Sequence, residues 1–140
     1  MSRNYFKEKA DLIPEELNGA ALAYLGDAVL EIMVRQKVME SGYTNTGKLN
    51  ELARMFVTAK AQSEATDKIA DLLDEEELSF FKRGKNAKVN RPKSATASDY
   101  AKATGFEALF AFLYMKGRKD RLDYLFSQAY KDRFDEILNK

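Results

Sequence analysis

Apolar residues along the chain recur at helical spacing, and no stretch of any length alternates apolar and polar positions as a half-buried strand does. A long helix is predicted from Asn18, whose side chain can cap its start, to about Glu40, where Ser41 and Gly42 end it. The predicted core-facing positions of this helix are Leu22, Leu25, Val29, Ile32 and Met33. The sequence has no internal repeat, and its pattern predicts an all-α fold.

The other predicted helices follow the same period. Pro14 suits the first turn of a short leading helix. The later helices are predicted to begin at Thr46, Thr58, Asp74, Ser98 and Asp120. Their apolar positions are Ile69, Leu72 and Leu73, then Leu78, Phe80 and Phe81, and finally Leu122, Leu125, Phe126, Tyr130, Phe134 and Leu138. About residues 84–97 form the one candidate long loop, and loops of this length are more often functional or disordered than structural.

Composition narrows the possible chemistry. The 140 residues suit one domain, and no apolar run reaches the about 18 residues that a membrane helix needs. The first residues lack the apolar core of a secretory signal, so we expect a cytoplasmic protein with no membrane partner. Because the chain has no Cys and no His, disulfides, thiolate zinc sites and Ser-His-Asp triads are excluded. Catalysis would use carboxylates, lysines, hydroxyls, backbone amides or a hard metal ion.

Two isolated acids stand in the two most hydrophobic segments of the chain. Asp27 is the only charge within residues 20–30, and Glu107 is the only charge within residues 105–115. A carboxylate among apolar side chains loses hydration, so it takes up a proton or finds a cation. The coincidence predicts a divalent metal shared by Asp27 and Glu107. Oxygen ligands favour Mg²⁺, with Mn²⁺ as a substitute.

Neighbouring residues bear on this prediction. Gly26 lets another helix or a phosphate approach Asp27 closely, which would explain a glycine inside a helix at a cost of about 1 kcal/mol. The alternative is that an unrelated Lys or Arg neutralises each acid. For Glu31, one turn after Asp27, a salt bridge with Arg35 at the i,i+4 spacing is the favoured interpretation.

Charge is segregated along the chain. Residues 71–77 contain five acids, and residues 82–93 contain six cations and no acid. Glycine, asparagine and proline lie between these cations, as in segments that contact backbone phosphates, and small polar side chains suit the shallow minor groove of duplex RNA. No aromatic residue lies among them to stack single-stranded bases. The predicted RNA-binding residues are Lys82, Arg83, Lys85, Lys88, Arg91 and Lys93. The alternative is a solvated loop that keeps the protein in solution.

Two motifs resemble those of a known family. Residues 22–30 place an aromatic residue before Leu-Gly-Asp and small aliphatic residues after it, and this segment resembles the ribonuclease III signature. Residues 104–109 end in Glu-Ala-Leu and resemble the second acidic motif of that family. The short length, the absence of a double-stranded-RNA-binding domain after residue 140 and the segment 81–88 resemble the Mini-ribonuclease III branch. The resemblance covers about residues 15–138 of an expected catalytic domain at 1–140.

The resemblance implies a magnesium-dependent endoribonuclease that cleaves double-stranded RNA as a homodimer and leaves 5′-phosphates. Asp27 would occupy the catalytic aspartate position and Glu107 the metal-binding glutamate position. Tyr24 lies where the family has an aromatic residue that inserts into the partner subunit. For the Mini branch, the implied role is maturation of the 23S ribosomal RNA precursor in the bacterial cytoplasm, with a ribosomal protein as a candidate partner.

Two positions depart from the family pattern. The full-length enzymes carry glutamate where this chain has Ala23 and aspartate where it has Thr104. We therefore expect weaker metal binding and more water and phosphate ligands, with the Thr104 hydroxyl as a donor to a metal-bound water. These departures leave open a non-catalytic RNA-binding or ribosome-assembly module on the same fold. A third alternative is a helical bundle that binds a protein partner and has no salt-dependent RNA affinity.

The aromatic residues leave a further choice open. Tyr24, Phe110, Phe112 and Tyr114 can supply an apolar dimer interface, and a twofold axis would match the two strands of a duplex. They can equally form one dense monomer core, because aromatic residues at helical spacing are usually buried. The prediction of a dimer depends mainly on the family resemblance.

Overall fold

The computed structural model describes residues 12–138, and all regular structure in that range is helical. In chain order the elements are η1 (Pro14–Glu16), α1 (Gly19–Met39), α2 (Thr46–Val57), α3 (Ala59–Ile69), η2 (Ala70–Leu72), α4 (Glu75–Lys85), α5 (Ala97–Met115) and α6 (Lys119–Ile137). The predicted all-α class is confirmed. None of the described helices has the length and apolar character that a bilayer span requires. The start of the chain, predicted to carry no secretory segment, and both ends of the expected 1–140 domain lie outside the described residues.

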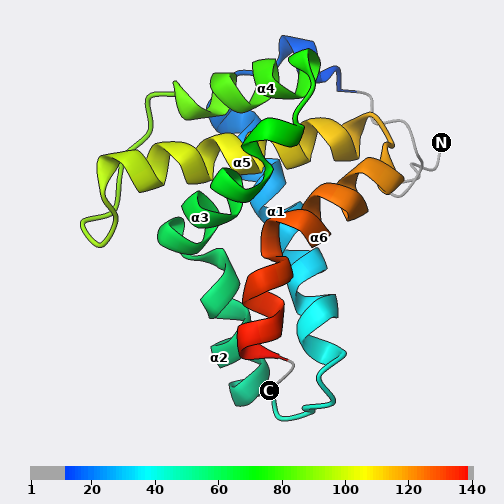
Figure 1. The fold of residues 1–140 in the computed structure, drawn as a ribbon. Helices are drawn as coiled ribbons and strands as arrows, with labels where there is room; N and C mark the ends of the chain where they lie inside the picture. The colour runs from blue at the N-terminus through cyan, green and yellow to red at the C-terminus, as the bar shows by residue number, and fades with distance from the viewer. Residues whose placement is uncertain (1–11, 139–140) are drawn as a thin grey trace, which may run out of the picture.

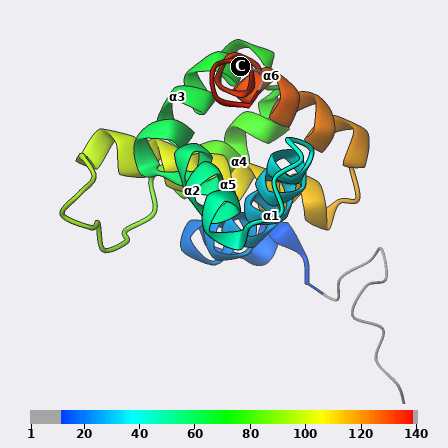
Figure 2. The same ribbon diagram turned by 90° about the horizontal axis from the view of Figure 1, so that it is seen from below.

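Helix α5 crosses the middle of the molecule, and α1, α3, α4 and α6 all pack against it (Figure 1). Its residues from Ala103 to Met115 are buried except for Glu107 and Tyr114. A helix that is apolar on nearly every side is expected inside a bundle rather than at its surface. The segment 86–96, which connects α4 to α5, projects from one side of the molecule, away from α6 (Figure 2).

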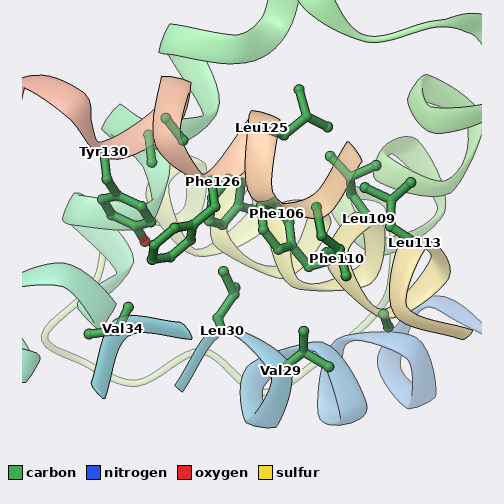
Figure 3. Close-up of a cluster of buried hydrophobic side chains, with 14 of the residues drawn as sticks. Val29, Leu30, Val34, Phe106, Leu109, Phe110, Leu113, Leu125, Phe126 and Tyr130 are labelled. Carbon is green, nitrogen blue, oxygen red and sulfur yellow. The ribbon is translucent and has the colours of Figure 1, made fainter. Parts of the chain in front are cut away.

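The core forms where α1, α5 and α6 meet. Figure 3 shows its side chains, among them Leu30 of α1, Phe110 of α5 and Phe126 of α6. The Tyr130 ring is fully buried, and its hydroxyl donates a 2.7 Å hydrogen bond to the Phe56 carbonyl. This buried hydroxyl is therefore paired. Phe110 and Phe112 are fully buried in the monomer, so for these two residues the alternative of a monomer core is correct.

Local hydrogen bonds set the helix ends close to the predicted positions. The side chain of Asn18 accepts from Ala21 N at 2.8 Å, and that of Thr58 accepts from Ala61 N at 3.1 Å, as predicted for both caps. Two caps lie earlier than predicted. Asn45 rather than Thr46 caps α2, and Thr96 rather than Ser98 caps α5.

Three residues predicted to face the core are exposed instead. Ile32 is 60% exposed, and Leu72 and Leu78 are also exposed. The reason for Ile32 is that α1 packs on α5 through the row that contains Gly26 and Leu30, which places Ile32 on the outer surface. The periodicity was correct, but the choice of the buried side was wrong at this residue.

The acidic segment 71–77 has a structural role. Asp74 and Glu77 form a reciprocal capping box at the start of α4. Glu77 is only 1% exposed, and Arg121 of α6 donates to both of its carboxylate oxygens, at 2.7 and 2.8 Å. Arg118 pairs with Glu76 at 2.8 Å. These acids therefore attach α4 to α6.

Candidate active site

Gly26 marks the closest approach of α1 and α5. A Cβ atom at this position would lie 1.7 Å from the carbonyl oxygen of Glu107 and 2.4 Å from its carbonyl carbon. Both neighbours are backbone atoms of a buried helix, so they cannot move aside as a flexible side chain could. Glycine is thus required here, and the contact brings Asp27 beside Glu107.

The carboxyl groups of Asp27 and Glu107 meet at this crossing. Burial is the main cause that raises the pKa of Glu107, and the charge of Asp27 and a hydrogen bond with Asp27 raise it further, to about 8. The amide of Gln62 acts in the opposite direction. Asp27 itself is exposed, so the pair joins one largely buried carboxyl group to one that solvent and substrate can reach.

Neither acid is neutralised by its own cation. Within residues 12–138, no Lys or Arg lies within ion-pair distance of Asp27 or Glu107, which argues against the alternative of two unrelated salt bridges. Glu31 behaves differently, because Arg35 Nε lies 3.0 Å from its Oε1. The predicted salt bridge at Glu31 is confirmed.

The two carboxyl groups fit a single hard cation. Over the described part of the chain, no third acid joins them in a cluster of metal-binding side chains. Mg²⁺ is commonly held by one or two protein carboxylates and keeps several waters, or takes phosphate oxygens of its substrate. Because the pKa of Glu107 is raised, an ion that binds there would displace the Glu107 proton and pair with the carboxylate that remains.

The two positions that depart from the family pattern add no charge here. Ala23 and Thr104 are both buried. The Thr104 hydroxyl donates a 2.8 Å hydrogen bond to the Tyr100 carbonyl within α5. Its proton is therefore already used by the backbone, which contradicts the expected donation to a metal-bound water.

The predicted RNA-binding residues fall into two groups. Lys82, Arg83 and Lys85 belong to the last turns of α4, and the others lie in the segment 86–96. The side chains of Lys82, Lys85, Lys88, Arg91 and Lys93 are exposed. Arg91 donates a 3.0 Å hydrogen bond to the Ala95 carbonyl, which bends its side chain back over the segment.

Arg83 differs from the other five cations. Its Nη1 donates to the carbonyls of Pro14, Glu15 and Leu17, at 3.3, 3.0 and 3.0 Å. Its guanidinium also lies over the Phe80 ring, 4.7 Å from the centroid. Arg83 thus holds the segment before α1 against α4, a structural role that the sequence did not indicate, and its contact with RNA stays a prediction.

The outer surface of α1 is apolar near the active site. Tyr24 is 86% exposed, and Ala28 and Ile32 follow it at intervals of four residues. Residues at this spacing share one side of a helix. Tyr114 on α5 is also exposed.

Gln62 is the site residue that the sequence analysis missed. It lies on α3 and is 2% exposed, and its side-chain amide lowers the pKa of Glu107. The sequence did contain a signal, because Gln62 precedes the inward-facing Ile69 by seven residues and so shares its side of the helix.

The pH dependence of stability tests the carboxyl pair. The unfolded chain loses the Glu107 proton near 4.5, whereas the folded protein keeps it up to about pH 8. The folded state therefore binds more protons between these values, and the metal-free protein should lose stability as pH rises, on the order of 4 kcal/mol in total. Glu107→Gln should abolish this decrease in urea unfolding at pH 5.5–8.5 measured with a chelator present. Glu31→Gln is the matched control and should keep it. An equal decrease in wild type and Glu107→Gln would contradict the assignment.

Comparison with known proteins identifies the family of the chain. Residues 20–118 match the Ribonuclease III domain family. Mini-ribonuclease 3 of Desulfitobacterium hafniense is 42% identical over 115 residues, which cover 82% of this chain and 73% of that protein. The Enterococcus faecalis Mini-ribonuclease 3 is 39% identical over 120 residues, covering 84% of this chain and 91% of its own.

A solved structure shows the same fold. The X-ray structure of protein FN1578 from Fusobacterium nucleatum superposes with a TM-score of 0.78 at 33% sequence identity and covers 85% of this chain and 92% of its own. The chain therefore belongs to the Mini-ribonuclease 3 branch of the ribonuclease III family, endoribonucleases that bind RNA and generally depend on a divalent metal.

Proposed function

We propose that this endoribonuclease cleaves double-stranded RNA with Mg²⁺, and that Asp27 and Glu107 are its catalytic and metal-binding residues. The observation that carries this proposal is the carboxyl pair at the crossing of α1 and α5, with no cation of the described chain beside it. Mn²⁺ would serve as a substitute, because it accepts the same oxygen ligands and octahedral geometry.

The two acids would have different roles because one is largely buried and the other is exposed. When bound, a divalent ion supplies Lewis acidity toward the phosphodiester and an activated water for hydrolysis. The burial of Glu107 fixes the position of its carboxyl group, and the exposed Asp27 faces the surface from which RNA can approach. Cleavage in this orientation would leave 5′-phosphates, as the family resemblance implies.

The exposed cations would hold the duplex. Lys82 and Lys85 at the end of α4, with Lys88, Arg91 and Lys93 in the segment after it, form a basic stretch, to which Arg83 adds a half-exposed guanidinium. Contacts from such side chains go mainly to phosphates, so they would fix the position of the RNA without reading its sequence.

We further propose a homodimer built on α1. Tyr24 and Ile32 expose large apolar side chains on one side of that helix, next to the active site. A second copy related by a twofold axis would bury these side chains and present two active sites to the two strands of a duplex. On the resemblance to the Mini-ribonuclease III branch, the proposed substrate is the 23S ribosomal RNA precursor in the bacterial cytoplasm, with a ribosomal protein as a candidate partner.

One observation favours a second candidate function. Ala23 and Thr104 occupy two acidic positions of the family pattern, and both are buried without adding charge to the site. A protein with this arrangement can also act as an RNA-binding or ribosome-assembly module that does not cut. It would bind duplex RNA and show no metal-dependent cleavage.

Cleavage by an Asp27 variant separates these functions. Asp27→Asn should reduce Mg²⁺-dependent cleavage of a perfect RNA duplex about a thousandfold or more, because one of two carboxylates is lost. Glu31→Gln, one turn along α1, should retain wild-type cleavage, since Glu31 pairs with Arg35. Product bands on a denaturing gel, with chelator and duplex DNA as controls, measure the rates. Wild-type cleavage by Asp27→Asn would exclude the proposed site.

Salt dependence tests the basic stretch. Lys88→Ala should reduce the slope of log affinity against log salt by about 1, since one phosphate contact is lost. Binding is measured by fluorescence anisotropy of a duplex RNA in Ca²⁺, across several KCl concentrations. Lys131→Ala on α6 is the matched control and should leave the slope unchanged. If both variants keep the wild-type slope, the stretch is a solvated loop at this position.

Oligomeric state tests the α1 surface. Tyr24→Ser should raise the dimer dissociation constant by at least about a hundredfold, because two buried aromatic rings are lost per dimer. Sedimentation equilibrium measures this constant, and Tyr124→Ser, at an exposed tyrosine of α6, should not change it. A wild-type monomer, or an unchanged constant in Tyr24→Ser, would contradict this interface.

A further inference from the structure

Gln62 is an unusual buried residue. Its side chain is 2% exposed, and its Nε2 is the one buried side-chain nitrogen or oxygen in the described range that has no hydrogen-bond partner. Native proteins pair nearly all such groups, because an unpaired buried donor destabilises the folded state. A glutamine at this position is therefore not explained by folding stability.

The surroundings of Gln62 point to the active site. Its helix, α3, packs directly on α5, and its other buried residues are three apolar ones and two with small hydroxyl side chains, namely Ala61, Ala65, Ile69, Ser63 and Thr66. The Thr66 hydroxyl is paired, since its Oγ1 donates a 2.9 Å hydrogen bond to the Gln62 carbonyl. The Gln62 amide lies near the Glu107 carboxyl group and lowers the pKa of that group, against the larger effects of burial and Asp27.

We propose that Gln62 is a positioning residue whose side-chain N–H donates to the Glu107 carboxylate and orients it beside Asp27 when the site binds its divalent ion. This inference rests on the proposed function. Glutamine suits this role because its side-chain amide is a hydrogen-bond donor without charge. A Lys or Arg at this position would cancel the negative charge that the ion requires, whereas an amide fixes the oxygen and leaves the charge available.

The effect of a substitution distinguishes a positioning role of Gln62 from a role in packing alone. Methionine has nearly the shape of glutamine and no polar N–H, so Gln62→Met keeps the packing and removes the unpaired donor. If Gln62 positions Glu107, stability and activity should move in opposite directions. If Gln62 only packs, the substitution should leave cleavage and ion binding unchanged.

The experiment uses the whole chain and three measurements. In Gln62→Met we expect the melting temperature of the metal-free protein to rise by about 2–5 °C, because an unsatisfied buried donor is removed. The Mg²⁺ concentration that gives half of the ion-induced rise in melting temperature should increase about tenfold, and kcat for a duplex RNA should fall about 10- to 100-fold. Gln62→Leu should behave in the same way and serves if the methionine variant does not fold.

Thr66→Val is the matched control, because it removes a polar side-chain group from the same surface of α3 and leaves the Gln62 amide in place. We expect it to keep wild-type Mg²⁺ dependence. Unchanged ion binding in both Gln62 variants would overturn the inference, as would a lower melting temperature with wild-type cleavage. If the wild-type chain does not cut RNA, the proposed function fails, whereas the Mg²⁺ titration of melting temperature still decides the role of Gln62.

Discussion

The backbones of α1 and α5 touch where Gly26 meets the carbonyl group of Glu107, at a distance that leaves no room for a Cβ atom. This contact fixes the relative position of the two most apolar helices, and α3, α4 and α6 also pack against α5. It also determines the chemistry, because Asp27 follows Gly26 directly and its carboxyl group is carried to Glu107. Close packing and the active site thus depend on the same glycine, and a side chain there would displace both.

The electrostatics of the site follow from how little charge it contains. Ala23 and Thr104 are buried next to the pair without adding an acid, and the Thr104 hydroxyl is bound to its own helix. Glu107 is therefore surrounded mainly by apolar groups, one exposed carboxylate and the Gln62 amide. Such a site stabilises a proton when empty, and an incoming cation must displace that proton. Metal binding should accordingly be weaker than in a site with four acids.

Much of this arrangement could be predicted from sequence, for physical reasons that differ between residues. Helix ends such as Asn18 and Thr58 depend on local hydrogen bonds, and the lone charges of Asp27 and Glu107 are conspicuous in apolar helices. The structural role of Arg83 and the exposure of Ile32 could not be predicted, because they depend on distant partners. Arg83 binds carbonyls of residues 14–17, and the buried side of α1 is set by its contact with α5. Gln62 was missed because only the fold brings α3 to Glu107.

The proposed active site depends on the coupling between the carboxyl groups of Asp27 and Glu107. Carbon-13 NMR of the side-chain carboxyl groups in the metal-free protein measures it most directly. We expect Glu107 to titrate near pH 8 in the wild type and at clearly lower pH in Asp27→Asn. A Glu107 resonance that titrates near 4.5, or one that Asp27→Asn does not move, would contradict it.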